Sequence, residues 1–202
     1  MSMLTTPQAV TYGQDASIMR FSVARYQRMV ETGVLTADDK VELLENYVVL
    51  KMPRNPPHDS TIDRTLDLLY PHKPKGWRLR VQSAIALSDS QPEPDFAFVR
   101  GSAADYEHQH PGPADIGKLI EVADSSLLRD QRDKTRIYAR ANIPVYWIVN
   151  LVDRRVEVYS QPSGPTVQPA YGSFQIYQPG DSVPIVLDGN TVGSVAVSDL
   201  IP

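Results

Sequence analysis

An unbroken apolar run at residues 144–151 (PVYWIVNL) constrains the fold of this chain more than any other feature. The run has the length of a strand, and its composition is typical of a central strand that is buried on both faces. Such a strand needs neighbours in a sheet and covering layers on both sides. With 202 residues, the chain is long enough to supply both within one domain.

The segments around this run predict an alternation of helices and strands. Amphipathic spacing predicts helices over residues 56–70 and 127–141, with Asn142 as the end of the second. Strands are predicted over residues 77–87, 93–100, 118–124, 144–151 and 154–161. From residue 57 onward the order is therefore helix, three strands, helix, strand, strand. That order predicts an α/β fold with a mixed sheet flanked by helices.

A helix and a hairpin are predicted ahead of this core. Ser22 is a suitable N-cap and Gly33 a suitable terminator for a helix whose apolar face would hold Val23, Tyr26, Gln27 and Val30. Residues 41–52 then predict a β-hairpin that turns at Glu45-Asn46, because Asn tolerates positive φ. The proline-rich stretch at 52–58 predicts a loop. For the helix that follows, Asp59 or Ser60 is the expected cap.

The chain is expected to form one domain. Residues 1–20 show little periodicity and are expected to be a loose lead-in, while residues 21–202 form the domain. Its core would span about 57–160 and be followed by a C-terminal β extension at 161–202. This extension is rich in Gly, Pro, Ser and Gln, and residues 185–197 predict one more strand or hairpin.

Composition excludes several kinds of site. The chain has no cysteine, which removes disulfides, thiolate zinc sites and a cysteine nucleophile, and fits a cytoplasmic protein. No apolar run approaches the roughly 18–20 residues of a membrane span, and the first residues do not resemble a signal peptide. The net charge of -4 argues against a globally basic nucleic-acid binder, although a helix carrying Arg129, Arg132, Arg136 and Arg140 could form a local basic patch.

Two carboxylates on neighbouring predicted strands are the strongest functional signal. Asp95 follows a proline at the start of one strand, and Glu121 lies between Ile120 and Val122 in another. A buried carboxylate costs several kcal/mol unless it is paired or bound to a metal. Two such groups together favour proton sharing or a divalent cation, for which Mg²⁺ or Mn²⁺ is suited. The alternative is structural: Glu121 faces solvent and Asp95 caps a turn.

A polar stripe on the next helix adds to this signal. Asp130, Lys134 and Tyr138 recur at intervals of four residues and so share one face. A partly buried Lys134 near paired carboxylates could orient a water molecule or stabilise developing negative charge. The alternative from the pattern alone is a surface ion pair between Asp130 and Lys134, with Tyr138 in the core.

Taken together, these residues resemble a restriction endonuclease family called Uma-two, within the PD-(D/E)XK nuclease superfamily. The resemblance covers roughly residues 20–160 and consists of six short pieces in family order. The pieces are Glu42-Leu43-Leu44-Glu45, Met52-Pro53 with His58, Glu93-Pro94-Asp95, residues 121–126 (EVADSS), Asp130 with Lys134 and Tyr138, and residues 143–150 (IPVYWIVN).

The chain also departs from the family pattern. The superfamily lysine normally lies two residues after the second acid, where this chain has Ala123. The resemblance implies that Lys134 on the helix takes over that role. The remaining departures replace turn or strand residues and leave Asp95, Glu121 and Lys134 in place; they are Asn46, Asp124, Asn142, Val145 and Asn150.

The resemblance implies a restriction-endonuclease-like α/β fold, with a central mixed sheet flanked by helices and an N-terminal helix and β-hairpin. It implies a metal-dependent endonuclease that hydrolyses phosphodiester bonds of nucleic acid, with DNA as the expected substrate. Asp95, Glu121 and the Val122 carbonyl would hold Mg²⁺ (or Mn²⁺), and Lys134 would act on the attacking water. Glu42 and His58 are additional catalytic candidates; alternatively, Glu42 faces solvent and His58 is exposed.

Two rival functions remain open at this stage. One is a catalytically silent module that binds nucleic acid or a protein on the same fold. The other is a hydrolase of small phosphate esters that uses the same carboxylates. A long basic groove would favour the nuclease, and metal at Asp95 and Glu121 would exclude the silent module. Cleavage of both strands of a duplex needs two sites, so we expect a homodimer, and loops such as 101–116 would have to supply any sequence specificity.

Overall fold

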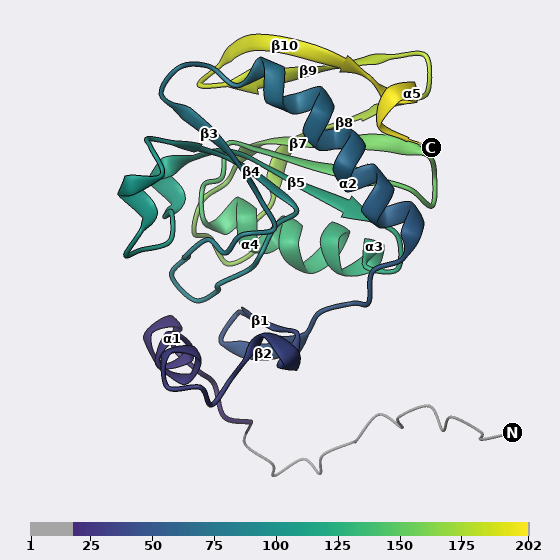
Figure 1. Ribbon diagram of the computed structural model, residues 1–202. Coiled ribbons are helices and arrows are strands. Elements are labelled where there is room, and N and C mark those ends of the chain that lie inside the picture. Colours follow the sequence, from purple (N-terminus) through teal and green to yellow (C-terminus); the bar gives the residue numbers. More distant parts are fainter. Residues whose placement is uncertain (1–17, 202) are drawn as a thin grey trace, which may run out of the picture.

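The computed structural model describes residues 18–201, so the expected lead-in at 1–20 lies almost wholly outside the described residues. Its centre is a six-stranded sheet with the order β3-β4-β5-β6-β7-β8 (Figure 1). The strands are Trp77–Val81 (β3), Phe96–Arg100 (β4), Ile116–Ala123 (β5), Val145–Asn150 (β6), Arg155–Pro162 (β7) and Tyr171–Tyr177 (β8). Only β5 and β6 pair in parallel, and the other neighbours are antiparallel, which confirms the mixed sheet.

A different layer covers each face of this sheet (Figure 1). One face packs against α2 (Pro56–Leu69), the hairpin of β9 (Ser182–Leu187) and β10 (Asn190–Ala196), and the short α5 (Val197–Leu200). The other face packs against a helical segment made of α3 (Leu127–Arg129), a π-helical turn (Asp130–Lys134) and α4 (Thr135–Arg140). Apolar side chains of the sheet alternate between these two cores, as the period of a strand requires.

The alternation places the two predicted carboxylates on one side of the sheet. Phe96 and Phe98 of β4 belong to the core under α2, whereas Ala97 and Val99 belong to the core under α4. On β5, Leu119 and Ala123 share the α4 side, so Glu121 between them faces that side as well. Asp95, which precedes Phe96, and Glu121 therefore both belong to the α4 side of the sheet.

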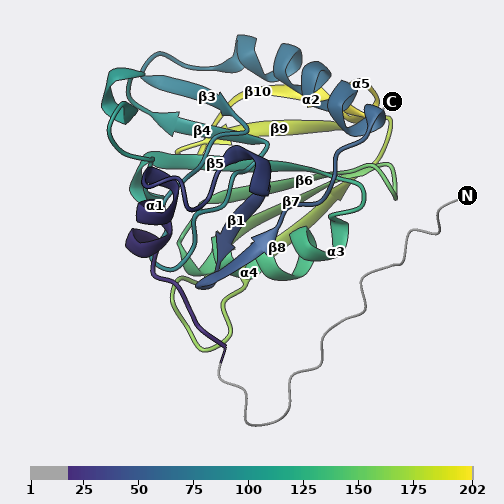
Figure 2. The ribbon, with the colours of Figure 1, turned by 60° about the horizontal axis from the view of Figure 1, so that its bottom comes forward.

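The N-terminal part forms a small cap beside the α4 side of the sheet (Figure 2). We use the name N-terminal cap for α1 (Val23–Glu31) together with the hairpin of β1 (Val41–Leu44) and β2 (Tyr47–Leu50). Ser22 caps α1, and the hairpin turns through Glu45 and Asn46 at φ values of 49° and 67°, as the sequence predicts. The predicted apolar face of α1 is confirmed in part, because Tyr26 is buried and Val23 and Gln27 are half-buried, whereas Val30 is exposed.

Four further sequence expectations need correction. The second helix is capped by Asn55, whose side chain accepts a hydrogen bond from the His58 N–H, rather than by Asp59 or Ser60. The strand predicted over 77–87 ends at Val81. The C-terminal extension contributes β8 to the main sheet in addition to the β9–β10 hairpin. Within the helix after Glu121, the π-helical turn was not expected.

One lysine lies inside the core. Lys118 of β5 is fully buried, and its Nζ lies 3.7 Å from the centre of the Trp147 ring. Within the described part of the chain, this Nζ has no hydrogen-bond partner. Burial lowers the pKa of Lys118 well below its usual value. The cation–π contact offsets only part of the cost of burying an amine.

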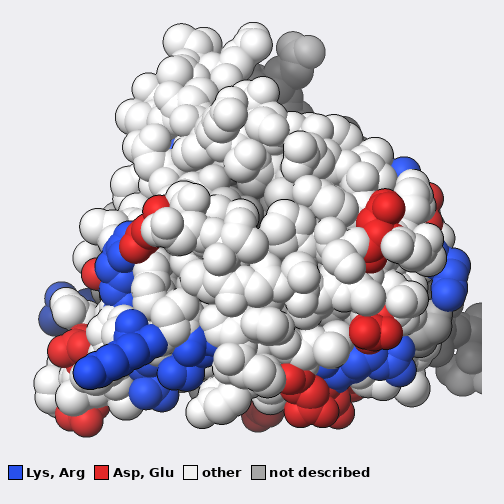
Figure 3. Space-filling model, turned by 90° about the horizontal axis from the view of Figure 1, so that it is seen from above, with Lys and Arg blue, Asp and Glu red and all other residues white. Residues whose placement is uncertain are grey.

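The C-terminal layer, by which we mean β9, β10 and α5, carries almost no charge. From residue 158 to 202 the sequence contains three aspartates and no lysine or arginine. Figure 3 views this side of the molecule and shows a largely uncharged surface with charged side chains towards its border. Among residues 18–201, no helix has the length and apolar character needed to cross a membrane.

Candidate active site

One pocket of about 450 Å³ collects every residue that the sequence proposes for catalysis or metal binding. It lies where the N-terminal cap meets the ends of β4 and β5 and the start of α2. The proposed residues that line it are Glu42, His58, Asp95, Glu121, Val122 and Lys134. They come from five separate elements or loops, so the fold, rather than local spacing, brings them together.

Asp95 occupies the position immediately before β4 and is buried. One of its oxygens, Oδ2, accepts a hydrogen bond of 2.9 Å from the Val122 N–H and lies 3.5 Å from Nε2 of His58. The other oxygen, Oδ1, accepts a bond of 3.2 Å from the Gln82 amide. Burial alone would raise the pKa of Asp95, but His58 and the Val122 N–H hold it below its usual value.

His58 contacts Asp95 directly, which contradicts the expectation of a freely exposed histidine. It lies in the first turn of α2, and its side chain is about 12% exposed. Although burial opposes its charge, Asp95 and Asp59 raise the pKa of His58 above its usual value. His58 therefore favours the ionised form of Asp95.

Glu121 is held by two donors from the helical segment. Its Oε1 accepts hydrogen bonds from Lys134 Nζ at 2.8 Å and from the Tyr138 hydroxyl at 2.9 Å. Burial, together with the nearby carboxylates of Asp130 and Asp95, raises the pKa of Glu121 well above its usual value, and Lys134 opposes this rise. Both Lys134 and Tyr138 are buried, so the expected surface ion pair on this helix is wrong.

Asp130 belongs to this site, although it was not among the predicted site residues. It is about 1% exposed; its Oδ2 accepts a bond of 2.6 Å from the Ser126 hydroxyl, and its Oδ1 lies 3.5 Å from Lys134 Nζ. The π-helical turn spans Asp130 to Lys134, and such turns occur frequently at functional sites. The stripe of Asp130, Lys134 and Tyr138 was the signal that could have identified Asp130 as part of the site.

Glu42 lies on the cap side of the same pocket. It is about 3% exposed, and the Glu93 N–H donates a bond of 3.3 Å to its carboxylate. The solvent-facing alternative for Glu42 is therefore wrong. Its negative charge contributes, after that of Glu121, to the raised pKa of Lys134, which stays protonated despite its burial.

The charge balance of the pocket fits a divalent cation. Four buried carboxylates line it, from Glu42, Asp95, Glu121 and Asp130, and burial raises the pKa of both Glu121 and Asp130. Within residues 18–201, no three His, Asp or Glu side chains are arranged to hold a metal by themselves. Mg²⁺ does not require such a cage, because it binds through one or two carboxylates and keeps several waters. The carboxylates of Asp95 and Glu121 meet that requirement.

Basic side chains line the more exposed part of the same pocket, which we call the basic rim. They are Lys40, Lys51, Arg54 and Arg129, of which Lys51 is paired with Glu93 and Arg54 lies 3.9 Å from Asp59. The expected arginine patch on the helical segment is largely neutralised, since Arg136 and Arg140 both bind Glu45 and Arg132 binds Asp133. Arg129 is the member of that patch that reaches the pocket.

The central mixed sheet, its flanking helices and the acidic pocket at the start of β4 define a restriction-endonuclease-like α/β protein. Comparison with known families agrees, since the profile of the Uma2 family, described as "Putative restriction endonuclease", matches residues 23–190. The chain therefore belongs to the Uma2 family.

A solved structure is similar over nearly its whole length. It is a "putative nuclease belonging to DUF820" from Anabaena variabilis, with a TM-score of 0.62 and 13% sequence identity. The match covers 89% of this chain and 97% of the other, and at this identity it shows a shared fold. No curated protein matches the chain.

Proposed function

We propose that the protein is a metal-dependent endonuclease that hydrolyses phosphodiester bonds of nucleic acid, with DNA as the expected substrate. One observation carries this proposal: a single pocket combines an acidic floor with a basic rim. The floor contains Asp95 and Glu121, and the rim contains Lys40, Arg54 and Arg129. A polyanion can rest on such a rim while its phosphate faces the carboxylates.

Asp95, Glu121 and the Val122 carbonyl would hold Mg²⁺ or Mn²⁺. When bound, the metal supplies a Lewis acid for the phosphate and lowers the pKa of a coordinated water. The His58 contact keeps Asp95 ionised, and the Val122 N–H fixes the position of its carboxylate. These contacts prepare the carboxylate as a ligand before substrate arrives.

Lys134 is the group that we expect to act on the attacking water or on the charge that develops at the phosphate. Its ammonium stays protonated beside Glu121 and Asp130, so it acts as a fixed positive charge rather than as a base. Tyr138 donates to the same oxygen of Glu121 and restrains that side chain. The helix thus supplies the lysine that Ala123 cannot supply from the strand.

A silent binding module is the second candidate, and the Lys134–Glu121 contact favours it. This ion pair already compensates one buried carboxylate without a metal. Under this alternative the basic rim binds nucleic acid and no bond is broken. A homodimer is expected only where both strands of a duplex are cut, because each cut requires its own pocket.

The test is cleavage of supercoiled plasmid, single-stranded DNA and RNA in the presence of Mg²⁺ or Mn²⁺. Cleavage by the parent protein should fall by a factor on the order of 10²–10⁴ in each of Asp95→Asn, Glu121→Gln and Lys134→Ala. Asp188→Asn is the matched control, because Asp188 lies far along the chain and pairs with Arg100 outside the pocket. Cleavage that survives in all three variants contradicts the assigned site, and the absence of cleavage on any polymer favours the binding module.

A further inference from the structure

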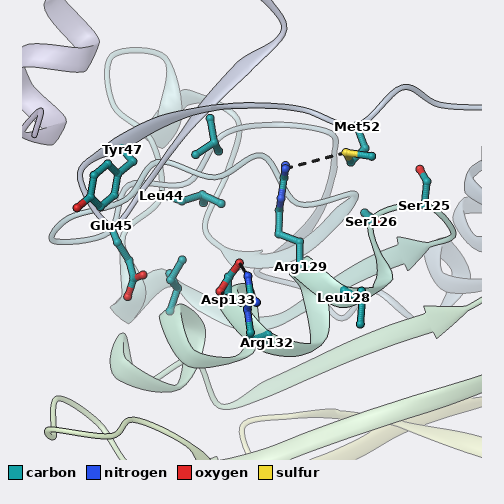
Figure 4. A pocket seen from close by; sticks show the side chains of 12 residues that line it. Leu44, Glu45, Tyr47, Met52, Ser125, Ser126, Leu128, Arg129, Arg132 and Asp133 are labelled. Carbon is teal, nitrogen blue, oxygen red and sulfur yellow. Dashed lines mark hydrogen bonds and ion pairs between the residues drawn. The ribbon is translucent and has the colours of Figure 1, made fainter. Parts of the chain in front are cut away.

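A second hollow, which we call the side groove, lies next to the active-site pocket (Figure 4). It has a volume of about 480 Å³ and lies between the hairpin of the N-terminal cap and the helical segment. Met52, Ser125, Ser126 and Arg129 line both the side groove and the active-site pocket. Because they share these walls, whatever enters the side groove lies beside the phosphate-binding site.

About half of the side chains in the walls of the side groove are apolar or aromatic. Leu44, Tyr47 and Val49 come from the hairpin, and Ile137 comes from α4. Its carboxylates are already paired, since Glu45 binds Arg136 and Arg140 and Asp133 binds Arg132 (the latter pair is drawn in Figure 4). The groove therefore offers apolar and aromatic surface beside charges that are already compensated.

Exposed apolar side chains surround the opening. Leu128 is about 80% exposed, and Met52 about 41% exposed. Arg129 lies beside them: its guanidinium donates to the Leu50 carbonyl at 2.7 Å and approaches the sulfur of Met52 at 4.0 Å (Figure 4). A guanidinium next to apolar side chains is a surface on which a planar aromatic ligand can stack.

We propose that the side groove binds an unpaired nucleobase that flanks the phosphodiester held in the active-site pocket. The inference rests on the proposed nuclease function and defines its substrate class as single-stranded or locally unpaired nucleic acid. A base inside a regular duplex is enclosed in the stack and has to leave it to enter a hollow of this kind. Stacking on apolar and aromatic side chains tolerates any base.

The first experiment uses the parent protein and needs no variant. Binding of a fluorescein-labelled single-stranded oligonucleotide is measured by anisotropy with EDTA present, and an abasic nucleotide is moved along the strand one position at a time. Cleavage of the same strands with Mg²⁺ or Mn²⁺ maps the cut bond. We expect one position beside the cut to weaken binding about 5- to 150-fold when abasic, and the duplex to bind at least several-fold more weakly than the single strand.

The second experiment fills the side groove. Val49→Trp, on the groove wall, should weaken binding of the intact strand and remove the effect of the abasic position, because the base no longer enters. Val167→Trp is the matched control on an exposed valine and should change neither. Circular dichroism verifies that both variants are folded. If Val49→Trp does not fold, the abasic scan on the parent protein still tests the inference.

The outcomes separate this inference from the nuclease proposal. Cleavage without any position-specific abasic effect, or with equal binding of duplex and single strand, overturns the side-groove inference and leaves the nuclease in place. A position-specific effect on binding without cleavage supports the side groove and overturns the nuclease. Binding of neither form overturns both.

Discussion

The N-terminal cap and the C-terminal layer cover opposite sides of one sheet, and they are attached in different ways. The C-terminal layer is joined by apolar packing, with Val183, Ile185 and Leu200 inside the main core. The cap carries some buried leucines, but many of its contacts are polar: Glu45 binds two arginines, and the Asn46 N–H donates to the Asp89 carbonyl at 2.7 Å.

The two regions also differ in whether they line the active-site pocket. The cap forms one wall of the active-site pocket and of the side groove, whereas the C-terminal layer lines neither. Apolar burial contributes a large and salt-insensitive stabilisation, whereas each partly exposed polar contact contributes about 1 kcal/mol or less. The layer remote from the pocket is therefore expected to contribute more to stability than the cap does, and the cap supplies polar groups to the substrate side.

The largest expected effect lies in the C-terminal layer. Ile185→Ala should lower the free energy of unfolding by about 2–5 kcal/mol, because Ile185 is fully buried and its removal leaves a cavity. Urea denaturation measures this loss, and the proposed nuclease activity per folded molecule should not change. Ile176→Ala, at a position about 42% exposed, is the matched control and should cost far less. An equal loss in both variants contradicts the assigned source of stability.

The second-largest effect is expected for Lys118, the buried lysine of the central sheet that both regions cover. Lys118→Met should raise the free energy of unfolding by about 1–3 kcal/mol at neutral pH, because it removes a buried amine that lacks a hydrogen-bond partner within residues 18–201. Since folding lowers the pKa of Lys118, the unfolded chain binds more protons at pH values below about 10.5.

It follows that the stability penalty from Lys118 grows as the pH falls below about 10.5. The advantage of Lys118→Met over the parent protein should therefore shrink as denaturation curves are recorded from pH 7 up to pH 10. An advantage that does not depend on pH would show that Lys118 remains charged in the folded protein.

The attachment of the cap should show a smaller and salt-dependent effect. Glu45→Gln removes the charge that holds Arg136 and Arg140, and should lower the free energy of unfolding by about 0.5–1.5 kcal/mol at low salt. Glu45 and both arginines are partly exposed, so the difference from the parent should decrease in 1 M salt. The absence of any difference at low salt would mean that the cap is attached mainly by apolar contacts.

The smallest effect is expected for an exposed ion pair of the C-terminal layer. Asp188, between β9 and β10, binds Arg100 at the end of β4, and both side chains are more than 40% exposed. Asp188→Asn should change the free energy of unfolding by no more than about 0.5 kcal/mol. Together with Ile185→Ala, this variant separates the polar from the apolar attachment of the same layer; a larger loss would mean that the layer depends on its ion pair.

Local signals in the sequence predicted the elements that the site requires. Glu121 was conspicuous because a carboxylate interrupts an apolar strand, and the structure then places Asp95 and Glu121 on one side of the sheet. The resemblance then suggested Lys134. The structure brings all three to one pocket, while their chemical roles remain proposals.

Other features depend on contacts that the sequence does not reveal. Asn55 begins α2, and its side chain also donates a hydrogen bond of 2.5 Å to Asp124, which lies beyond the end of β5. Strand β8 was missed because its residues are mostly polar or partly exposed, and its pairing with β7 defines it. The π-helical turn at Asp130–Lys134 coincides with the ion pairs that Lys134 makes with Glu121 and Asp130, and residue spacing gives no signal for it.

The scarcity of charge in the C-terminal layer also affects how the protein is digested. Trypsin cleaves after lysine and arginine, and the last such residue in this sequence is Arg155 at the start of β7. Complete digestion therefore leaves most of β7, the edge strand β8 and the whole β9–β10 hairpin within one long peptide. A mass-spectrometric survey that relies on short tryptic peptides would detect this protein through its cap and active site, and would need a protease of another specificity to observe the layer that stabilises it.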